Sequence, residues 1–175
     1  MRETERHVAL ARAPHPVLAF DFGTRRIGIA VGDTLTSTAA PRPPAHVHAS
    51  GPDWSAIERE VRAAQPRLLI VGVPYNADGS PGALTRAARR FARALGERFG
   101  LAVEHVDEHG SSLEASAALK ESRAGGERSR RVRRGELDSV AAAVILERWL
   151  TGERAREPSG SGSGASRTRE HDSSE

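Results

Sequence analysis

The chain contains no cysteine among its 175 residues. This absence excludes disulfide bonds, thiolate zinc sites and a cysteine nucleophile, so catalysis would have to use carboxylates, histidines, hydroxyls or a bound metal. No apolar run approaches the roughly 20 residues that cross a bilayer. Residues 1–16 also lack the apolar core and the small-residue cleavage site of a secretory signal. We therefore expect a cytoplasmic protein that does not associate with membranes.

Lysine and aromatic residues are scarce as well. Lys120 is the only lysine among 26 basic residues, and Phe, Trp and Tyr make up 4% of the chain. With so few rings for base stacking, nucleic-acid binding would be directed at the backbone. The arginine bias is explained by a GC-rich genome as readily as by selection for guanidinium chemistry, so composition alone assigns no function.

The length fits one globular domain with polar segments at both ends. Residues 1–16 include two prolines and show no sustained hydrophobic period, and residues 153–175 are rich in Gly, Ser and charge. A segment of that composition buries too little apolar surface to offset its ordering entropy. We expect a flexible segment at 1–16, a folded domain at 17–152 and a disordered tail at 153–175.

Hydrophobic periodicity within the domain predicts alternating strands and helices. Apolar runs at 17–23 and 26–32 indicate a hairpin, and three prolines between 36 and 50 restrict a third strand to a short piece or a sheet edge. Further elements are expected as follows: helices between Pro52 and Pro66, at 84–99, at 111–122 and at 136–150, and strands at 67–74 and 101–108. This order favours a mixed five-stranded sheet flanked by helices, with the ribonuclease H-like fold as the leading arrangement.

Asp21 stands inside an otherwise apolar strand. A buried carboxylate there costs several kcal/mol unless it is paired, hydrogen-bonded or bound to metal. A satisfied core aspartate or a strand-end turn former explains the pattern equally well. Gly23 and Gly28, on either side of the turn, permit a ligand to approach the backbone closely, although glycine at a hairpin is also ordinary turn chemistry.

Two more acidic positions accompany Asp21. Asp107 and Glu108 lie at the end of the strand at 101–108, where it runs out into a loop, and Asp138 lies in the first turn of the last predicted helix, where an acid gains ~0.3 to 1 kcal/mol from the helix dipole. Each position is ordinary by itself. We expect the first and last strands to be adjacent, however, and their carboxyl ends would then converge with Asp138.

Converging carboxylates with no cysteine, and with no histidine at ligand spacing, define a hard oxygen site suited to Mg²⁺ or Mn²⁺. Two such ions ~4 Å apart activate water and stabilise the leaving oxygen in phosphodiester hydrolysis. We therefore expect a nuclease with Asp21, Glu108 and Asp138 as metal ligands. Asp107 is the alternative to Glu108, because the parity of a strand end is not fixed by sequence.

A basic run precedes the predicted helix that contains Asp138. Six arginines and one glutamate fall between residues 123 and 134, and the remaining core has a slight excess of acids. The glycine pair at 125–126 predicts a mobile basic flap that holds phosphates near the acids, and a solvated loop without a partner is the alternative. The predicted nucleic-acid contacts are Arg128, Arg130, Arg131, Arg133 and Arg134.

Five segments in this order resemble the ribonuclease H-like family of bacterial Holliday junction resolvases and pre-16S ribosomal RNA nucleases. They are LAFDFGTRRIGIAVGD, PDWSAIE, IVGVPYNADGS, VDEHGSSLEA and GELDSVAAAVILERWL. The resemblance covers residues 17–150. It implies the ribonuclease H-like fold, a nuclease that uses divalent metal, and a bacterial cytoplasmic setting.

The resemblance also implies particular site residues. It assigns catalytic acids to Asp21, the Asp107–Glu108 pair and Asp138, and it places three loop residues near the substrate, namely Asn76, Asp78 and Gly79. His109 and Gly110 stand where the family usually has an arginine and a larger apolar residue. That difference removes a phosphate or intrasite contact without affecting the carboxylates.

Several functions are compatible with these residues. Processing of the 5′ end of pre-16S rRNA is favoured over Holliday junction resolution by resemblance alone, and we expect a monomer or weak homodimer. A non-catalytic RNA- or ribosome-associated factor is disfavoured, because clustered acids beside phosphate benefit catalysis and not binding. A sugar-kinase-like ATPase shares the DFGT turn, but it needs a second domain and a second phosphate loop.

Overall fold

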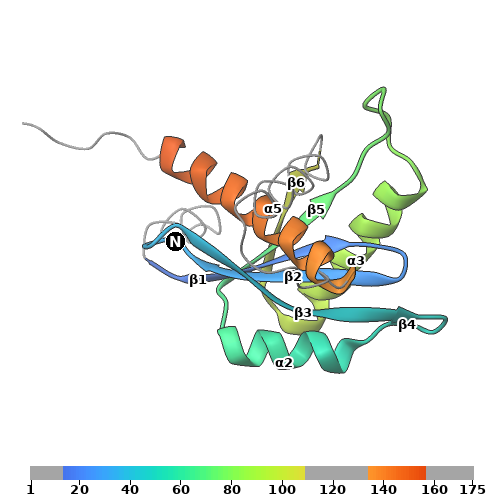
Figure 1. Cartoon of the computed structure of the whole chain (residues 1–175), viewed down its shortest axis with the longest axis horizontal. Helices are drawn as coiled ribbons and strands as arrows, with labels where there is room; N and C mark the ends of the chain where they lie inside the picture. The colour runs from blue at the N-terminus through green and yellow to red at the C-terminus, as the bar shows by residue number, and fades with distance from the viewer. Residues whose placement is uncertain (1–13, 109–133, 157–175) are drawn as a thin grey trace, which may run out of the picture.

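A computed structural model describes residues 14–108 and 134–156, which form one mixed sheet between two helical layers (Figure 1). The elements are β1 (Pro16–Phe22), β2 (Arg26–Asp33), β3 (Thr38–His48), β4 (Gly51–Pro52), α2 (Trp54–Ala64), β5 (Leu68–Val73), α3 (Ala83–Phe99), β6 (Ala102–Asp107) and α5 (Arg134–Arg156). The predicted helix at 111–122 and the glycine pair at 125–126 lie outside the described residues.

The sheet has the order β4-β3-β2-β1-β5-β6. β1, β2, β3 and β4 pair antiparallel in succession, whereas β5 pairs parallel to both β1 and β6. This mixed sheet flanked by helices confirms the predicted ribonuclease H-like fold class. The sheet has six strands and not five, because the two-residue β4 pairs with the end of β3.

The expectation that the first and last strands are adjacent is wrong. β5 lies between β1 and β6 and pairs with both. β5 follows the helix α2, and a right-handed crossover of this kind places a strand parallel to β1 and beside it. The next crossover, through α3, then adds β6 on the far side of β5.

β3 spans eleven residues and forms the sheet edge over most of its length, so of the two predicted alternatives, a short piece or a sheet edge, the second is the one observed. β4 covers only the last two residues of β3. The pairing of β2 with β3 shifts register between Ile27 and Ile29, opposite Pro43 and Pro44. A bulge of this kind accommodates prolines, which have no amide hydrogen to give to the ladder.

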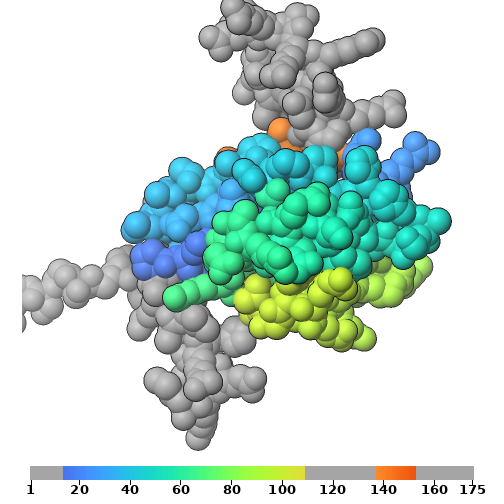
Figure 2. All heavy atoms as spheres, turned by 90° about the horizontal axis from the view of Figure 1, so that it is seen from below, coloured from blue at the N-terminus to red at the C-terminus, as the bar shows by residue number. Residues whose placement is uncertain are grey.

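Alternate side chains of β1 divide between the two faces of the sheet. Leu18 and Phe20 pack in the core with α2 and α3, whereas Val17 and Ala19 pack in the core with α5. Figure 1 shows α5 crossing one face and α2 lying under the other, and Figure 2 views the second face, where α2 lies beside α3 and β6. Asp21 follows Ala19 with the same parity, so its side chain belongs to the α5 face.

The helix ends follow from local signals. The Asp53 side chain caps α2 by accepting a hydrogen bond from the Ala56 amide at 3.1 Å, and Gly100 ends α3 with φ = 64°, as predicted. α5 extends further in both directions than the predicted 136–150. Asp138 therefore lies beyond the first turn of α5 and gains less from the helix dipole than expected.

None of the three described helices is long and apolar enough to cross a membrane.

Candidate active site

Asp21 lies between two glycines on the neighbouring strands. It pairs with Gly28 of β2 and with Gly72 of β5. A Cβ atom on Gly28 would lie 1.9 Å from the carbonyl oxygen of Asp138, and a Cβ atom on Gly72 would lie 2.8 Å from the Glu108 carboxyl carbon. The two glycines therefore leave the space in which the other two acids approach Asp21. At Gly28 the close approach is made by the backbone of α5.

Glu108 reaches Asp21 across β5. The Glu108 amide donates to the Val73 carbonyl at 3.2 Å, which continues the pairing of β6 with β5 by one residue. The carboxyl group of Glu108 forms a hydrogen bond with that of Asp21. Gly72, between them in the sheet, has no side chain to block this contact, and this explains how acids on strands that are not neighbours still meet.

Asp107 has the opposite parity from Glu108. It pairs with Val73, whereas Val106 pairs with Gly72 and packs in the α5 core. Since side chains alternate along a strand, Glu108 shares the face of Asp21 and Asp107 does not. The Asp107 side chain is exposed, and its carbonyl accepts a hydrogen bond from Arg148 at 3.4 Å.

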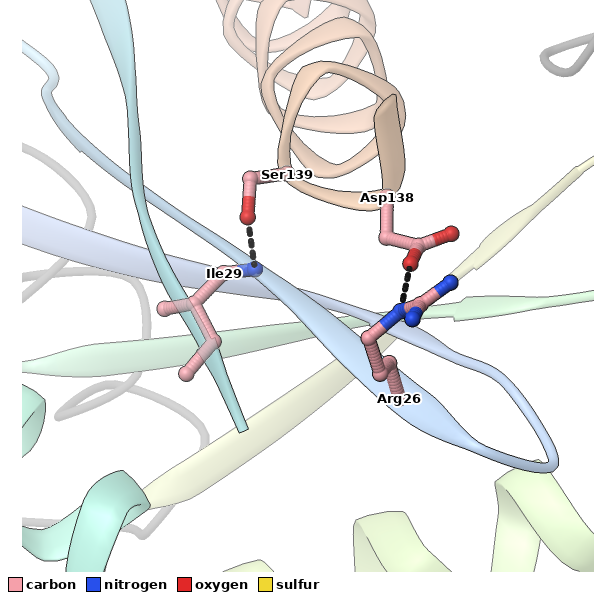
Figure 3. A network of polar contacts seen from close by, with 4 residues as sticks. All are labelled: Arg26, Ile29, Asp138 and Ser139. Atoms are coloured by element: carbon pink, nitrogen blue, oxygen red, sulfur yellow. Dashed lines mark hydrogen bonds and ion pairs between the residues drawn. The ribbon is translucent and has the colours of Figure 1, made fainter. Parts of the chain in front are cut away.

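Helix α5 is attached to β2 at two successive residues (Figure 3). Arg26 Nε donates to Asp138 Oδ2 at 2.8 Å in an ion pair whose side chains are 28% and 35% exposed. The Ile29 amide donates to Ser139 Oγ at 3.4 Å, and Ser139 is buried. The register shift between β2 and β3 lies beside this amide. The contacts place the carboxylate of Asp138 at the edge of the site.

The ionisation of Asp21 depends on its burial and on the two other acids. Burial raises the pKa of Asp21, the hydrogen bond from Glu108 opposes part of this shift, and the negative charge of Asp138 adds to it. Asp21 therefore retains a proton to higher pH than an exposed aspartate does. A hydrogen bond donated to a carboxylate favours its ionised form, so burial outweighs the contact with Glu108 at Asp21.

The chemistry of these donors suits a hard divalent cation. The site offers carboxylate oxygens, which Mg²⁺ and Mn²⁺ prefer, and the two flanking glycines keep the space between the acids clear. In the described part of the chain, however, no group of three or more His, Asp or Glu side chains is arranged to hold a metal ion. Asp138 is held by Arg26, while Asp21 and Glu108 bond to each other.

The β5–α3 loop contains the three residues that the resemblance places near the substrate. The amide nitrogen of the Asn76 side chain donates to Ser80 Oγ at 3.0 Å, Asp78 Oδ1 accepts from the Ser80 amide at 2.9 Å, and Gly79 adopts φ = 82°. The hydrogen bonds from Ser80 lower the pKa of Asp78. All three residues are exposed, and Figure 1 shows the loop extending away from the sheet beyond β5.

The arginines predicted to contact nucleic acid precede or open α5. Arg128, Arg130, Arg131 and Arg133 lie outside the described residues, and Arg134 opens α5 with its side chain not described. A different basic surface is described between α3 and the edge strand β6. There a groove of about 490 Å³ is lined by side chains that include Arg89, Arg93, Glu97 and His105. Burial and the charge of Arg89 lower the pKa of His105.

Three residues of this site were not predicted from the sequence: Arg26, Gly72 and Ser139. Gly72 carried a signal, because a glycine inside a buried strand marks a bulge or a close approach. Arg26 and Ser139 had no such signal in the sequence. The contact of Arg26 joins residues 112 positions apart, and that of Ser139 joins residues 110 positions apart. Only the packing of α5 on β2 reveals them.

Residues 15–152 match the family model described as "RuvX: Holliday junction resolvase". A protein of Nitrosococcus oceani is 48% identical over 139 residues, which are 79% of this chain and 88% of that protein. A protein of Edwardsiella ictaluri is 45% identical over 137 residues, 78% of this chain and 95% of that protein. Both are named "Putative pre-16S rRNA nuclease".

Two solved structures are similar at low identity. The RuvC protein of T. thermophilus in complex with a Holliday junction substrate is 15% identical, with a TM-score of 0.46 over 79% of this chain and 95% of that one. The Fowlpox virus resolvase in complex with Holliday junction DNA is 13% identical, with a TM-score of 0.46 over 82% of this chain and 99% of that one.

Proposed function

Because the chain belongs to the RuvX family of Holliday junction resolvases, we propose that it is the nuclease that processes the 5′ end of pre-16S rRNA during ribosome biogenesis. It is a hydrolase of phosphodiester bonds. The observation that carries the proposal is the convergence of Asp21, Glu108 and Asp138 on the α5 face of the sheet. The names of the relatives with 45 to 48% identity support RNA as the substrate.

Asp21, Glu108 and Asp138 are the residues that would hold Mg²⁺ or Mn²⁺. When bound, such an ion activates water and neutralises the charge that develops on the phosphate. The chain's own contribution is to bring together acids from β1, from the residue after β6 and from α5. The apolar core beneath α5 fixes the three backbones.

The exposed β5–α3 loop would contact the polymer near the cleavage point. Asn76 and Asp78 offer hydrogen-bonding groups at its tip, and the Gly79 backbone has no side chain to hinder approach. An ionised Asp78 repels phosphate, but a carboxylate accepts hydrogen bonds from ribose 2′-hydroxyls, which DNA lacks. The arginines at 128, 130, 131, 133 and 134 would supply phosphate contacts.

Holliday junction resolution is the second candidate, favoured by the description of the matching family. A resolvase cuts two symmetric strands and therefore acts as a dimer. We infer a monomer or weak homodimer in the bacterial cytoplasm, which fits RNA processing better, because cleavage of one RNA strand needs only one site.

The direct test offers purified protein two substrates, a ribosomal RNA precursor and a synthetic four-way DNA junction, each with Mg²⁺ or Mn²⁺. We expect cleavage of the precursor, its loss in Asp21→Asn and Glu108→Gln, and its retention in Glu58→Gln, which removes an acid from the α2 surface. Cleavage of the junction alone would reassign the substrate. Full activity in both site variants would refute the assignment of the catalytic acids.

A further inference from the structure

Arg26 forms an ion pair with one of the three acids of the site. Its Nε atom lies 2.8 Å from Asp138 Oδ2, while Asp21 and Glu108 are joined by their own hydrogen bond. The guanidinium group therefore stands against a carboxylate that a divalent cation would need. This contact distinguishes the present arrangement from one in which all three acids could bind one ion.

The ion pair is not what fixes α5 on the sheet. The backbone of Asp138 lies directly over Gly28, and the neighbouring Ser139 bonds to the Ile29 amide in a buried position. Further along α5, buried residues pack into the core with β1 and β5. With the backbone held by these contacts, the Asp138 side chain can exchange its partner without movement of the helix.

The charges make such an exchange reasonable. Asp138 acts on Asp21 through its negative charge, so an unneutralised Asp138 would add to the repulsion among the acids. Arg26 supplies the compensating positive charge from the first position of β2. Partly exposed ion pairs are weak and readily exchanged, and a divalent ion interacts with the same oxygens through twice the charge.

We propose that Arg26 is an exchangeable counter-ion of Asp138: it neutralises this carboxylate in the absence of metal, is displaced from it by a divalent cation, and then binds a phosphate group of the nucleic acid. A guanidinium group suits the second role because its planar donors match two phosphate oxygens. Only the phosphate half of this inference rests on the proposed function, since the metal half needs no substrate.

The metal half predicts that Arg26→Gln binds divalent cations more tightly. Removal of a competing ion pair of this exposure raises affinity by about two- to five-fold. Titration of Mn²⁺ into protein without nucleic acid measures it directly. Arg26→Lys keeps a competing charge, so its Mn²⁺ affinity should stay near that of the unchanged protein. Arg25→Gln is the matched control, because Arg25 is an exposed arginine of the same turn and should leave Mn²⁺ affinity unchanged.

If Arg26 merely orients Asp138 for metal binding, its replacement changes the Mn²⁺ affinity in the opposite direction. In that case Arg26→Gln would bind Mn²⁺ more weakly, and a weaker or unchanged affinity overturns the exchange. If Arg26→Gln does not fold, Arg26→Ala and Arg26→Lys are compared, and an affinity that fails to rise in the alanine variant overturns it equally. These measurements do not depend on cleavage, so they stand or fall separately from the proposed function.

The phosphate half is tested with Ca²⁺ in place of Mg²⁺ and a single-stranded RNA. We expect Arg26→Gln to bind RNA more weakly in the presence of Ca²⁺, with the slope of log K against log salt reduced by about 0.7, as for one lost contact to a single strand. Without divalent ions Arg26 remains on Asp138, so the variant and the unchanged protein should bind alike. Equal loss under both conditions, or no loss under either, overturns this half.

Discussion

Gly72 separates Asp21 from Glu108 in the sheet, and its lack of a side chain lets the two carboxyl groups bond across β5. In Gly72→Ala the new Cβ would lie 2.6 Å from Ile145 Cδ1 and 2.8 Å from Glu108 Oε1. Relief of this overlap costs about 1 to 3 kcal/mol of stability and moves Glu108 away from Asp21. We expect the cleavage rate of Gly72→Ala to fall by more than the decrease in its folded fraction explains.

Chemical denaturation and cleavage assays on the same preparation measure both effects. Gly152→Ala is the control, since a Cβ there meets nothing within 4 Å. In a helix this change should be neutral or stabilising by up to about 1 kcal/mol. Cleavage by Gly72→Ala at the rate of the control would show that Glu108 need not reach Asp21.

Asp21 and Asp138 should differ in what they contribute to stability. Because the pKa of Asp21 is raised in the folded state, folding is opposed as pH rises from the ordinary aspartate pKa through the raised one. Asp21→Asn removes this opposition, so at neutral pH without metal its melting temperature should be unchanged or higher. At acid pH, where Asp21 is protonated in both states, the difference should vanish.

Asp138→Asn breaks the ion pair with Arg26 and should lose stability, by no more than about 1 kcal/mol because the pair is partly exposed. It also removes one cause of the raised pKa of Asp21, which offsets part of that loss. Thermal melts of both variants at acid and neutral pH measure the contrast, and both should lose cleavage. A clear drop in the melting temperature of Asp21→Asn at neutral pH would contradict this account.

How far sequence predicts such a site depends on the kind of contact. Asp21 was identifiable because a carboxylate in an apolar strand needs a partner. The choice between Asp107 and Glu108 could not be made from the sequence, because it depends on the register of β6 against β5. Arg26 was missed for the same reason at longer range, since nothing near it in the chain indicates that α5 will pack over β2.

At the level of elements, periodicity predicted the described helices and every described strand except β4, but it did not predict which strands are neighbours in the sheet. The hairpin of β1 and β2 is local and was predicted, whereas the position of β5 between β1 and β6 depends on crossovers. The three prolines did not shorten β3, because prolines restrict pairing only where an amide is needed, and β3 has little strand pairing on its outer side.

The arginine run before α5 and helix α3 are the two candidates for binding the nucleic-acid backbone. The salt dependence of RNA affinity in variants of each distinguishes between them. We expect replacement of Arg130, Arg131, Arg133 and Arg134 by Gln to weaken RNA binding and to reduce the slope of log K against log salt by about 0.7 per lost contact. Turnover of bound substrate should change less, since phosphate contacts position the polymer without acting on the barrier.

Helix α3 provides the comparison. Arg86, Arg90 and Arg93 are exposed on it, and their replacement by Gln removes a similar charge from another part of the molecule. The slope should change less in this variant than in the first one. If the slope of log K against log salt falls only in the α3 variant, the RNA backbone binds along α3 and the groove beside β6. The arginines before α5 would then be solvated residues without a role in binding.

For the whole molecule, we propose a single nuclease domain at 17–152 flanked by a flexible segment at 1–16 and a tail at 153–175. The described elements run from Pro16 to Arg156, and His15 is buried with its amide bonded to Thr34. The ordered unit therefore extends slightly past both proposed boundaries. Composition gave these limits only approximately, because helix ends and strand starts are set by tertiary contacts.

Deletion of residues 158–175 should leave melting temperature and cleavage unchanged. This segment follows the end of α5 and contains one apolar residue other than glycine and proline, Ala165, so it has little to dock with. Differential scanning calorimetry and the precursor cleavage assay check it. A cooperative loss of melting temperature on truncation would show that the segment packs against the domain.

The position of α5 after all the described strands has a consequence for biosynthesis. A nascent chain that has emerged as far as residue 108 holds Asp21 and Glu108 but neither Asp138 nor the helix that covers Val17, Ala19 and Ile70. Translation at about 5 to 20 residues per second leaves that apolar face uncovered until α5 emerges. Synthesis of α5 therefore also completes the acidic site, so we expect a ribosome-bound, partly made chain to be a poor nuclease toward the RNA around it.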